Sequence, residues 1–329
     1  MNSESNTKSI HHPDVGSDLL KTYLLYGLSV ASEIDLKKDR TSADHFDLYI
    51  QKNRFIPKVK NPKTKSMTRI WEKKEGGWHL IYRDHSGGET IFEYNLDGSK
   101  ISISQTNRDW NQAVFVLLNP AMAAALYLQK KTVLHASSLV LDGCSYLFLG
   151  PSGMGKSTIS AALALNGFQL HADDMAVTDV HSDVPVVQSG YPLLKLFNHT
   201  ARELDLTETQ LKMIFPDTPD YPESWIHADQ FGTDFFDGPA ALKNIYILSG
   251  REKGANRFRT EKITSGKAVI SLLHYLYGDN WLEWPPEEKL KICTQIASKT
   301  SVYKLWVPDG IKPLLKAAKR FRHDVWNQS

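Results

Sequence analysis

Near the middle of the chain the sequence reads Gly150-Pro151-Ser152-Gly153-Met154-Gly155-Lys156-Ser157-Thr158. Residues 150–157 fit the pattern G-x-x-x-x-G-K-[ST] of a phosphate-binding loop. Its glycines let the backbone curl around an anion so that several N–H groups point at one phosphate. Lys156 would reach the outer phosphates, and the hydroxyl of Ser157 would bind Mg²⁺. We therefore expect residues 150–158 to bind the triphosphate of ATP.

The residues on either side have the character that such a loop requires. Tyr146–Leu149 is an apolar run typical of a strand, and Lys156–Asn166 carries apolar residues at helical spacing. Gly167 follows as a natural end to that helix. The alternative is a glycine-rich turn without a ligand, which would leave Lys156 without an evident role.

An acidic pair, Asp173-Asp174, follows the short run Phe168–Ala172. A strand, loop, helix and strand in this order begin a βαβ unit, whose strands are parallel neighbours or near neighbours. Their carboxyl ends share one edge of the sheet, which would bring the aspartates beside the phosphates. One carboxylate could hold Mg²⁺, and the other could accept a proton from an attacking hydroxyl. The alternative is a solvated acidic turn.

A hairpin places a histidine at the same edge. Asp142-Gly143 separates the apolar runs Leu134–Leu141 and Cys144–Leu149, and Asp-Gly between such runs is typical of a two-residue turn. In that register Leu141 faces Cys144, so His135 falls opposite Gly150. A lone histidine is more often structural than catalytic, but this register predicts His135 beside the loop.

The rest of the chain divides into regions that differ in their predicted secondary structure. Short β-prone runs separated by glycine turns, from about Lys21 to Gln105, predict an antiparallel meander. Asn111–Gln129 is expected to be a helix that Pro120 kinks or splits. Three further helices are predicted at Ser265–Tyr277, Glu287–Ser298 and Ile311–Phe321. Two strands are predicted at Leu242–Leu248 and Val302–Val307. Phe215–Pro239 has no clear period and is expected to be a long loop or lid.

His135, the loop and the acidic pair together resemble the catalytic domain of HPr kinase/phosphorylase, a relative of the ATP-type phosphoenolpyruvate carboxykinases. The likeness covers residues 133–180 well and the rest of the C-terminal half loosely. It implies an α/β fold, a mixed sheet with helices, preceded here by a β-rich antiparallel N-terminal domain. It also implies that Asp173 is the general base, that Asp174 binds Mg²⁺ with Ser157, and that His135 and Lys156 take part in catalysis. His135 would help to hold the phosphoryl group or the aspartate.

The chain also departs from that family. HPr kinases carry a Gly- and Arg-rich signature later in the chain, and Gly250–Gly254 is a poor substitute for it. This departure leaves an HPr substrate and the reverse phosphorylase reaction open. The opening Tyr23–Ile34 resembles the HPr-kinase homologues of lasso-peptide gene clusters, which phosphorylate the C-terminal serine of a precursor peptide. The resemblance therefore implies a precursor peptide as the phosphoryl acceptor.

The composition bears on the cellular compartment and on the classes of binding partner to expect. A net charge of +2 gives no reason to expect nucleic acid or a membrane as a partner. The apolar stretch Ala113–Leu128 is interrupted at Asn119 and Pro120 and looks too short to span a bilayer. Cys144 and Cys293 are too few for a disulfide or metal framework, so we expect a reducing cytoplasm. A homo-oligomer is left open.

These observations predict three regions and one activity. Residues 1–20 would form a disordered tail, residues 21–110 a β-rich domain for peptide recognition or assembly, and residues 111–329 the catalytic domain. The activity would be transfer of phosphate from ATP, with Mg²⁺, to a serine hydroxyl. The alternatives are a kinase of the same fold that acts on an HPr-type protein or a small molecule, and a non-catalytic nucleotide-binding sensor. A sensor that only binds the nucleotide would need no general base.

Lys195 and Arg202 are candidates for a second contact with the phosphates, although a surface position is the default expectation for both.

Overall fold

The computed structural model describes residues 20–36, 38–43, 45–53, 68–83, 88–106, 110–214 and 222–326. The predicted tail, residues 1–20, lies outside the described residues except for Leu20, and so does the start of the predicted lid, residues 215–221.

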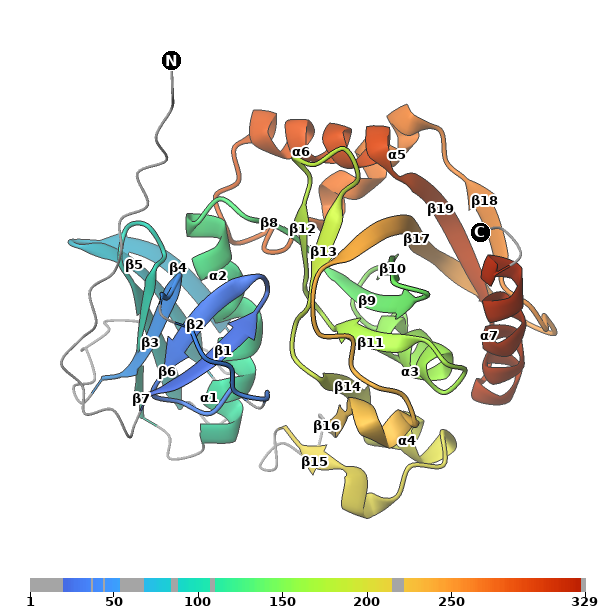
Figure 1. The fold of residues 1–329 in the computed structure, drawn as a ribbon, viewed down its shortest axis with the longest axis horizontal. Helices are drawn as coiled ribbons and strands as arrows, with labels where there is room; N and C mark the ends of the chain where they lie inside the picture. Colours follow the sequence, from blue (N-terminus) through green and yellow to red (C-terminus); the bar gives the residue numbers. More distant parts are fainter. Residues whose placement is uncertain are drawn as a thin grey trace.

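The first sheet is built from the N-terminal third of the chain. Its strands are β1 (Lys21–Leu25), β2 (Leu28–Ser32), β3 (Leu48–Lys52), β4 (Thr68–Lys74), β5 (Gly77–Arg83), β6 (Glu89–Tyr94) and β7 (Lys100–Gln105). They lie in the order β1-β2-β3-β7-β6-β5-β4 (Figure 1). From β4 to β7 the strands form the predicted antiparallel meander, because each pairs antiparallel with the next.

The prediction of a wholly antiparallel sheet is wrong at its centre. β3 pairs parallel with both β2 and β7. The β-prone run Tyr23–Val30, which the sequence pattern predicts as one strand, is divided between two strands. Tyr26 and Gly27 both take positive φ angles, 56° and 74°, and turn the chain back. Two central residues with positive φ make the tight hairpin turn that matches strand twist. Tyrosine is a poor signal for such a turn, so the sequence pattern missed it.

A buried helical run connects the two halves of the chain. It consists of α1 (Trp110–Val116), a π-helical turn (Leu117–Ala121) and α2 (Met122–Leu128). The π turn accommodates Pro120, whose missing N–H cannot donate to the carbonyl of Phe115; the side-chain amide of Asn119 donates there instead, at 2.9 Å. The helix is therefore continuous, and the expected break at Pro120 is replaced by one wide turn.

The second sheet is mixed and holds the phosphate-loop motif. Its strands are β8 (Thr132–Leu134), β9 (Ala136–Leu141), β10 (Cys144–Leu149), β11 (Gln169–Ala172), β12 (Ala176–Asp179), β13 (Val186–Gln188), β17 (Ala240–Glu252), β18 (Arg259–Lys262) and β19 (Ser301–Pro308). The order is β11-β9-β10-β17-β13-β12-β8, with β19 paired to β17 and β18. β10, β17 and β19 run parallel, whereas β9 is antiparallel to β10 and to β11.

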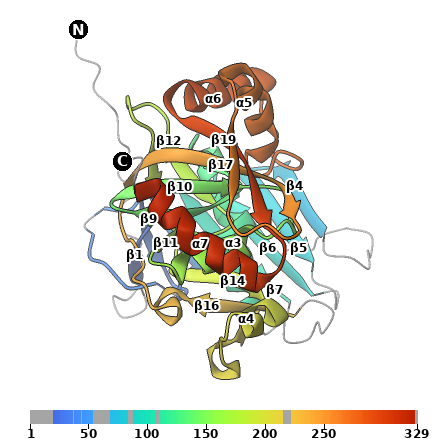
Figure 2. The same ribbon diagram turned by 90° about the vertical axis from the view of Figure 1, so that its right-hand side faces the viewer.

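Helices and a small third sheet surround this second sheet. The helices are α3 (Lys156–Ala164), α4 (Asn198–Glu203), α5 (Ser265–Leu272), α6 (Pro286–Lys299) and α7 (Ile311–Trp326). α3 and α7 contact each other, and Figure 2 shows α7 in front of the sheet. The third sheet contains β14 (Leu193–Phe197), β15 (Lys212–Met213) and β16 (Glu223–His227). β16 corrects the expectation of a lid over residues 215–239, because its residues pair with β14.

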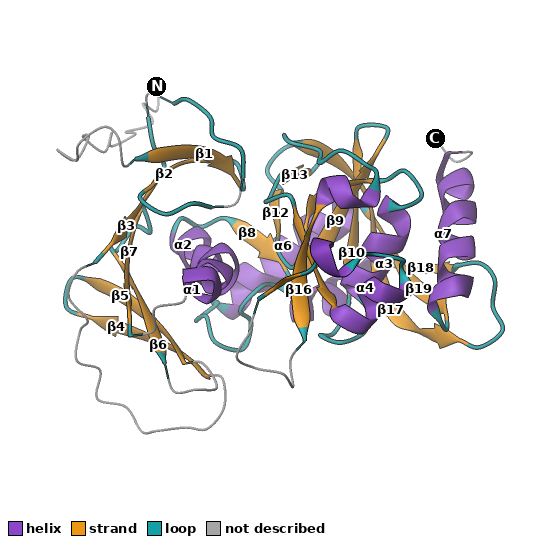
Figure 3. Cartoon of the chain, turned by 90° about the horizontal axis from the view of Figure 1, so that it is seen from below, coloured by secondary structure: helices purple, strands orange, loops and turns teal. Residues whose placement is uncertain are grey.

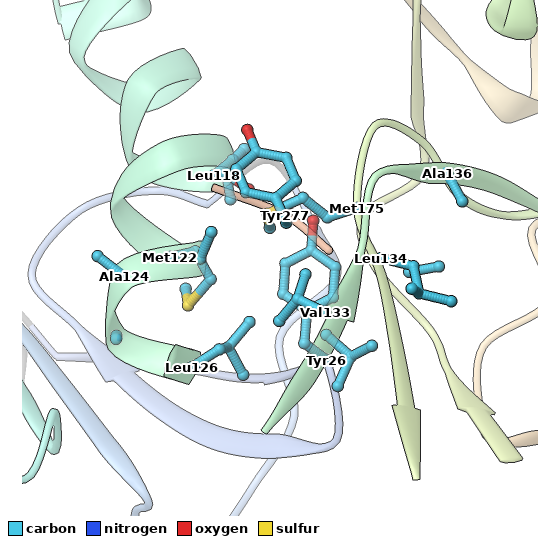
Figure 4. Packing of buried hydrophobic residues seen from close by; sticks show 14 of the residues in the cluster. Tyr26, Leu118, Met122, Ala124, Leu126, Val133, Leu134, Ala136, Met175 and Tyr277 are labelled. Carbon is cyan, nitrogen blue, oxygen red and sulfur yellow. Dashed lines mark hydrogen bonds between the residues drawn. The ribbon is translucent and has the colours of Figure 1, made fainter. Parts of the chain in front are cut away.

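One hydrophobic core joins the first sheet to the second through the helical run. Leu118, Met122 and Leu126 of the helix contribute to the same buried cluster as Val133 of β8 and Tyr26 of the first hairpin (Figure 4). Figure 3 shows the helix between the two sheets. Because this core is continuous, the predicted boundary at residue 110 divides the sequence but not the buried interior.

The shared core predicts that the two sheets lose structure together. Leu126 is fully buried, so Leu126→Ala should cost about 2–5 kcal/mol of unfolding free energy through the lost burial and the cavity left behind. Native-state hydrogen exchange should show earlier opening of backbone amides in both β5 and β10. Leu96→Ala is the matched control, because Leu96 is 62% exposed and should change little. Loss of protection in one sheet alone would contradict a shared core.

By length and composition, the helical run Trp110–Leu128 could cross a membrane. The sequence pattern predicts a stretch too short and too interrupted to span a bilayer, but the π turn keeps the helix continuous. Within the structure, 78% of its most apolar window is buried. A core helix passes the same test of length and composition, and this one packs between the two sheets.

Candidate functional site

The hairpin register is confirmed and brings His135 to the loop. Cys144 pairs with Leu141 and Leu149 with Ala136, as the Asp142-Gly143 turn predicted. His135 and Gly150 are the next residues along, at the carboxyl end of β10. β11 is the second neighbour of β10 across β9 and runs parallel to it, so the acidic pair reaches the same edge.

The loop after β10 has the backbone of an anion-binding turn. Gly153 and Gly155 take φ angles of 80° and 93°, a region that residues with a Cβ rarely enter. A Cβ added at Gly155 would lie 2.5 Å from the guanidinium Nη2 of Arg251. Gly155 also precedes the first turn of α3, where free backbone N–H groups favour an anion. Pro151, Ser152, Met154 and Thr158 belong to this segment, and their contacts with a nucleotide stay a prediction.

Lys156 lies inside the site and not on the surface. Its ammonium donates to the carbonyl oxygens of Gly150 at 2.9 Å and Pro151 at 3.4 Å. Burial lowers the pKa of Lys156, and the charges of Asp174 and Asp173 oppose that change. The ammonium is therefore held across the mouth of the loop, where outer phosphates would lie.

His135 joins Lys156 to the acidic pair. Its Nδ1 lies 3.0 Å from the backbone carbonyl oxygen of Asp174, which can only accept, so Nδ1 carries the proton. Its Nε2 lies 3.1 Å from Nζ of Lys156 and accepts from that ammonium. Burial lowers the pKa of His135, with the negative charge of Asp174 acting in the opposite direction. A neutral imidazole with a fixed tautomer thus orients the lysine.

This geometry predicts the effect of removing the imidazole. His135→Ala should slow any phosphoryl transfer by about a hundredfold, because Lys156 loses one of the acceptors that orient it and misplaced groups are costly in such reactions. ATP affinity, measured by calorimetric titration, should change much less. His323→Ala is the control, because His323 is exposed on α7. Wild-type transfer rates in His135→Ala would show that the contact with Lys156 has no catalytic value.

Asp173 is buried and contacts Ser157 in the first turn of α3. Its carboxylate oxygens both lie 3.3 Å from the hydroxyl of Ser157, which donates to them. Ser137 donates to Oδ1 at 2.7 Å, and the backbone N–H of Lys195 donates to Oδ2 at 3.1 Å. Burial raises the pKa of Asp173, the charge of Asp174 raises it further, and the bond from Ser137 opposes the rise. The structure thus joins Asp173 to the phosphate loop directly.

Asp174 occupies a different position from its neighbour. Its backbone has a φ of 66°, and its side chain is 22% exposed. Its Oδ1 lies 3.4 Å from Nδ1 of His135. The left-handed backbone turns the two consecutive carboxylates apart, so one faces Ser157 and the other faces His135.

Two further charged residues lie near the acidic pair, Lys195 and Glu223, and the sequence pattern points only to Lys195. Lys195 lies beside Asp173, whereas Arg202 is exposed in an ion pair with Glu208 and is not part of the site. Glu223 of β16 is 8% exposed and lies 3.8 Å from the Lys195 ammonium. No pattern in the sequence points to Glu223, because residues 215–239 have no clear period and read as a loop. Ser137 could have been found, since it lies two residues after His135 on the predicted strand.

The residues of the site fit a magnesium ion that arrives with a nucleotide. Among the residues that the structure describes, no group of three or more His, Cys, Asp or Glu side chains could hold a metal on its own. Mg²⁺ usually takes one or two carboxylates together with phosphate oxygens and water. The Ser157 hydroxyl and the paired aspartates are oxygen donors of that kind, and Ser157 contacts Asp173.

Comparison with known proteins gives likenesses in structure but none in sequence. A scan against models of known families found no match, and a search of curated proteins found none either. Among solved structures, the chain is similar to the Hpr(Ser) kinase/phosphatase from Coxiella burnetii, with 18% identity and a TM-score of 0.33. The alignment covers 60% of this chain and 93% of that chain. A likeness at this TM-score carries no weight for function, which is therefore proposed from the geometry of the site.

Proposed function

We propose that this chain is an ATP- and Mg²⁺-dependent kinase that phosphorylates a serine hydroxyl. The observation that supports it most is the contact between Ser157 of the phosphate loop and the buried carboxylate of Asp173. A phosphate loop alone binds nucleotide, whereas a buried acid with a raised pKa beside it supplies a proton acceptor.

Each residue then has a defined task in phosphoryl transfer. The N–H groups of the loop and the ammonium of Lys156 bind the triphosphate and neutralise its charge. His135 orients Lys156 through Nε2. The acceptor oxygen attacks the γ-phosphorus while an aspartate takes its proton, and the electron pair of the broken P–O bond leaves with ADP. A bound Mg²⁺ would neutralise charge on the β- and γ-phosphate oxygens.

The roles of the two aspartates are open to a direct test. The family resemblance assigns Asp173 as base and Asp174 as magnesium ligand, and the raised pKa of buried Asp173 supports a base at that position. The contact of Asp173 with Ser157 favours the opposite order, since Ser157 is the predicted magnesium ligand of the loop. We keep the first assignment as the proposal, because a base needs a pKa raised toward neutrality.

The acceptor that we propose is the C-terminal serine of a lasso-peptide precursor. The support is the sequence resemblance of the N-terminal opening, and the N-terminal sheet would then recognise the peptide. The protein would act in the cytoplasm. An HPr-type protein or a small molecule remains the alternative acceptor for the same active site.

Mass spectrometry tests this proposal. Wild-type protein, ATP and Mg²⁺ should add one phosphoryl group to a synthetic precursor peptide ending in serine, and none to the same peptide ending in alanine. Transfer to an HPr-type protein and not to the peptide would keep the kinase and change its acceptor. ATP binding without transfer to peptide, protein or small alcohols would favour the non-catalytic sensor and end the kinase proposal.

A further inference from the structure

A second lysine lies beside the acidic pair, and it comes from a different sheet. Lys195 belongs to β14 of the small third sheet, whereas the loop and both aspartates follow strands of the second sheet. The backbone N–H of Lys195 donates to Oδ2 of Asp173 at 3.1 Å, which fixes this strand to the site. The side chain of Lys195 is 25% exposed, so the ammonium is partly shielded but accessible.

The strand directs this lysine away from the hydrophobic cluster that buries its two neighbours. Leu194 and Leu196, on either side of it, are buried in a hydrophobic cluster, and side chains alternate along a strand. Lys195 therefore lies on the opposite face, where its Nζ is 5.4 Å from the centre of the Phe115 ring and 3.8 Å from Oε2 of Glu223. The aromatic face and the carboxylate both attract a cation, so they hold its charge near the acidic pair.

The charge of Lys195 acts on the groups of the site. Burial raises the pKa of Glu223, and the ammonium of Lys195 is the main influence against that rise. Burial also dominates the pKa shifts of Asp173, Lys156 and His135, and Lys195 contributes a lowering of the pKa at each of them. A positive charge that acts on all of these groups lies within the field of the reacting centre.

Lys156 and Lys195 are placed for different parts of the reaction. Lys156 lies across the loop, against the carbonyls of Gly150 and Pro151, where the leaving nucleotide would be. The backbone of Lys195 meets Asp173 at Oδ2, whereas Ser137 donates to Oδ1, and the Lys195 ammonium lies near Glu223 and Phe115. Phosphoryl transfer needs charge stabilisation on the transferred group as well as on the nucleotide.

We propose that Lys195 is a further catalytic residue, whose ammonium contacts the oxygens of the phosphoryl group during its transfer, and that Glu223 positions it. This inference depends on the kinase function proposed above. As the acceptor oxygen bonds to the γ-phosphorus and the bond to the β-phosphate oxygen breaks, the hydroxyl proton goes to an aspartate and the electron pair goes to ADP. Lys195 keeps its protons throughout and stabilises negative charge on the transferred oxygens.

The test compares Lys195→Met with two other variants. Methionine keeps an unbranched apolar side chain and removes the charge, so kcat for transfer should fall by about a hundred- to a thousandfold, as when one stabilising donor is removed. The Kd for ATP and the melting temperature should stay close to wild type. Lys195→Arg should recover part of kcat. Lys304→Met, at an exposed position of β19, is the matched control and should behave like wild type.

The readout follows the radiolabelled γ-phosphate of ATP to a synthetic peptide ending in serine or to water. If wild type transfers no label to the peptide, to water, to an HPr-type protein or to small alcohols, both this proposal and the kinase proposal fail. If wild type and Lys304→Met transfer label, and Lys195→Met is equally fast, only the role of Lys195 fails. A loss confined to KM for the peptide, with kcat unchanged, would also overturn it, because that result describes acceptor binding alone.

Glu223→Gln tests the positioning role separately. It keeps the shape of the side chain and removes its charge, so kcat should fall by about tenfold in the wild-type background. Combined with Lys195→Met it should cause no further loss, because the two residues act through one interaction. Full additivity of the two losses would show that Glu223 acts independently of Lys195.

Discussion

Lys156→Ala should abolish phosphoryl transfer and weaken ATP binding. The ammonium of Lys156 is buried at the mouth of the loop, and nothing else in the loop supplies a full positive charge to the outer phosphates. The loop N–H groups would remain, so the variant should still bind nucleotide weakly. Calorimetric titration with MgATP gives the affinity, and the labelled-phosphate assay gives the rate.

The fold itself should tolerate this change. The ammonium loses its bonds to the Gly150 and Pro151 carbonyls, which face the mouth of the loop. Thermal melting of the variant should therefore remain close to that of wild type, which separates a chemical loss from unfolding. Lys304→Ala serves as the control at an exposed strand position. Wild-type ATP affinity in Lys156→Ala would remove residues 150–158 as the nucleotide site.

Asp173→Asn and Asp174→Asn should both slow transfer, but in different ways. Asparagine at 173 keeps the shape and cannot accept a proton, so the rate should fall by about a hundred- to ten-thousandfold while ATP still binds. Asparagine at 174 replaces a carboxylate with a weaker amide oxygen, so activity should need a higher Mg²⁺ concentration. Rate measurements across a magnesium titration separate these two outcomes.

The reversed pattern is also informative. If Asp173→Asn shows the magnesium requirement and Asp174→Asn the pure loss of rate, the contact between Ser157 and Asp173 marks the metal side of the site. If neither variant slows transfer, the active site lies elsewhere in the chain.

The pH dependence of the transfer rate gives an independent test of Asp173 as the base. Because burial and Asp174 raise the pKa of Asp173, the wild-type rate should fall with acid at a higher pH than an exposed aspartate would give.

The parts of the site that depend on local patterns were predictable from the sequence. The Asp142-Gly143 turn fixes the register of its two strands, so it placed His135 at the loop. The order of strand, loop, helix and strand brought Asp173 to Ser157, since parallel strands end at one edge. These relations need only turn chemistry and chain direction.

The parts that depend on long-range pairing were not predictable. Glu223 enters the site because β16 pairs with β14, and its short run carries no clear strand pattern. β3 lies between β2 and β7 with parallel pairing on both sides, although the strands are far apart in sequence. The Tyr26-Gly27 turn was missed because tyrosine rarely adopts a positive φ, and only the surrounding contacts hold it there. Local propensity cannot report such tertiary effects.

The helical run Trp110–Leu128 also determines how this protein could be recombined with a relative. Its side chains pack with the first sheet and with β8 at once, so a crossover at either end would join a helix from one parent to a sheet from the other. Interiors tolerate volume changes poorly, and a mismatched seam of this kind would leave voids or clashes. Chimaeras should therefore survive only when the helix and both of its neighbours come from one parent, which makes exchange of the N-terminal region alone a poor route to new acceptors.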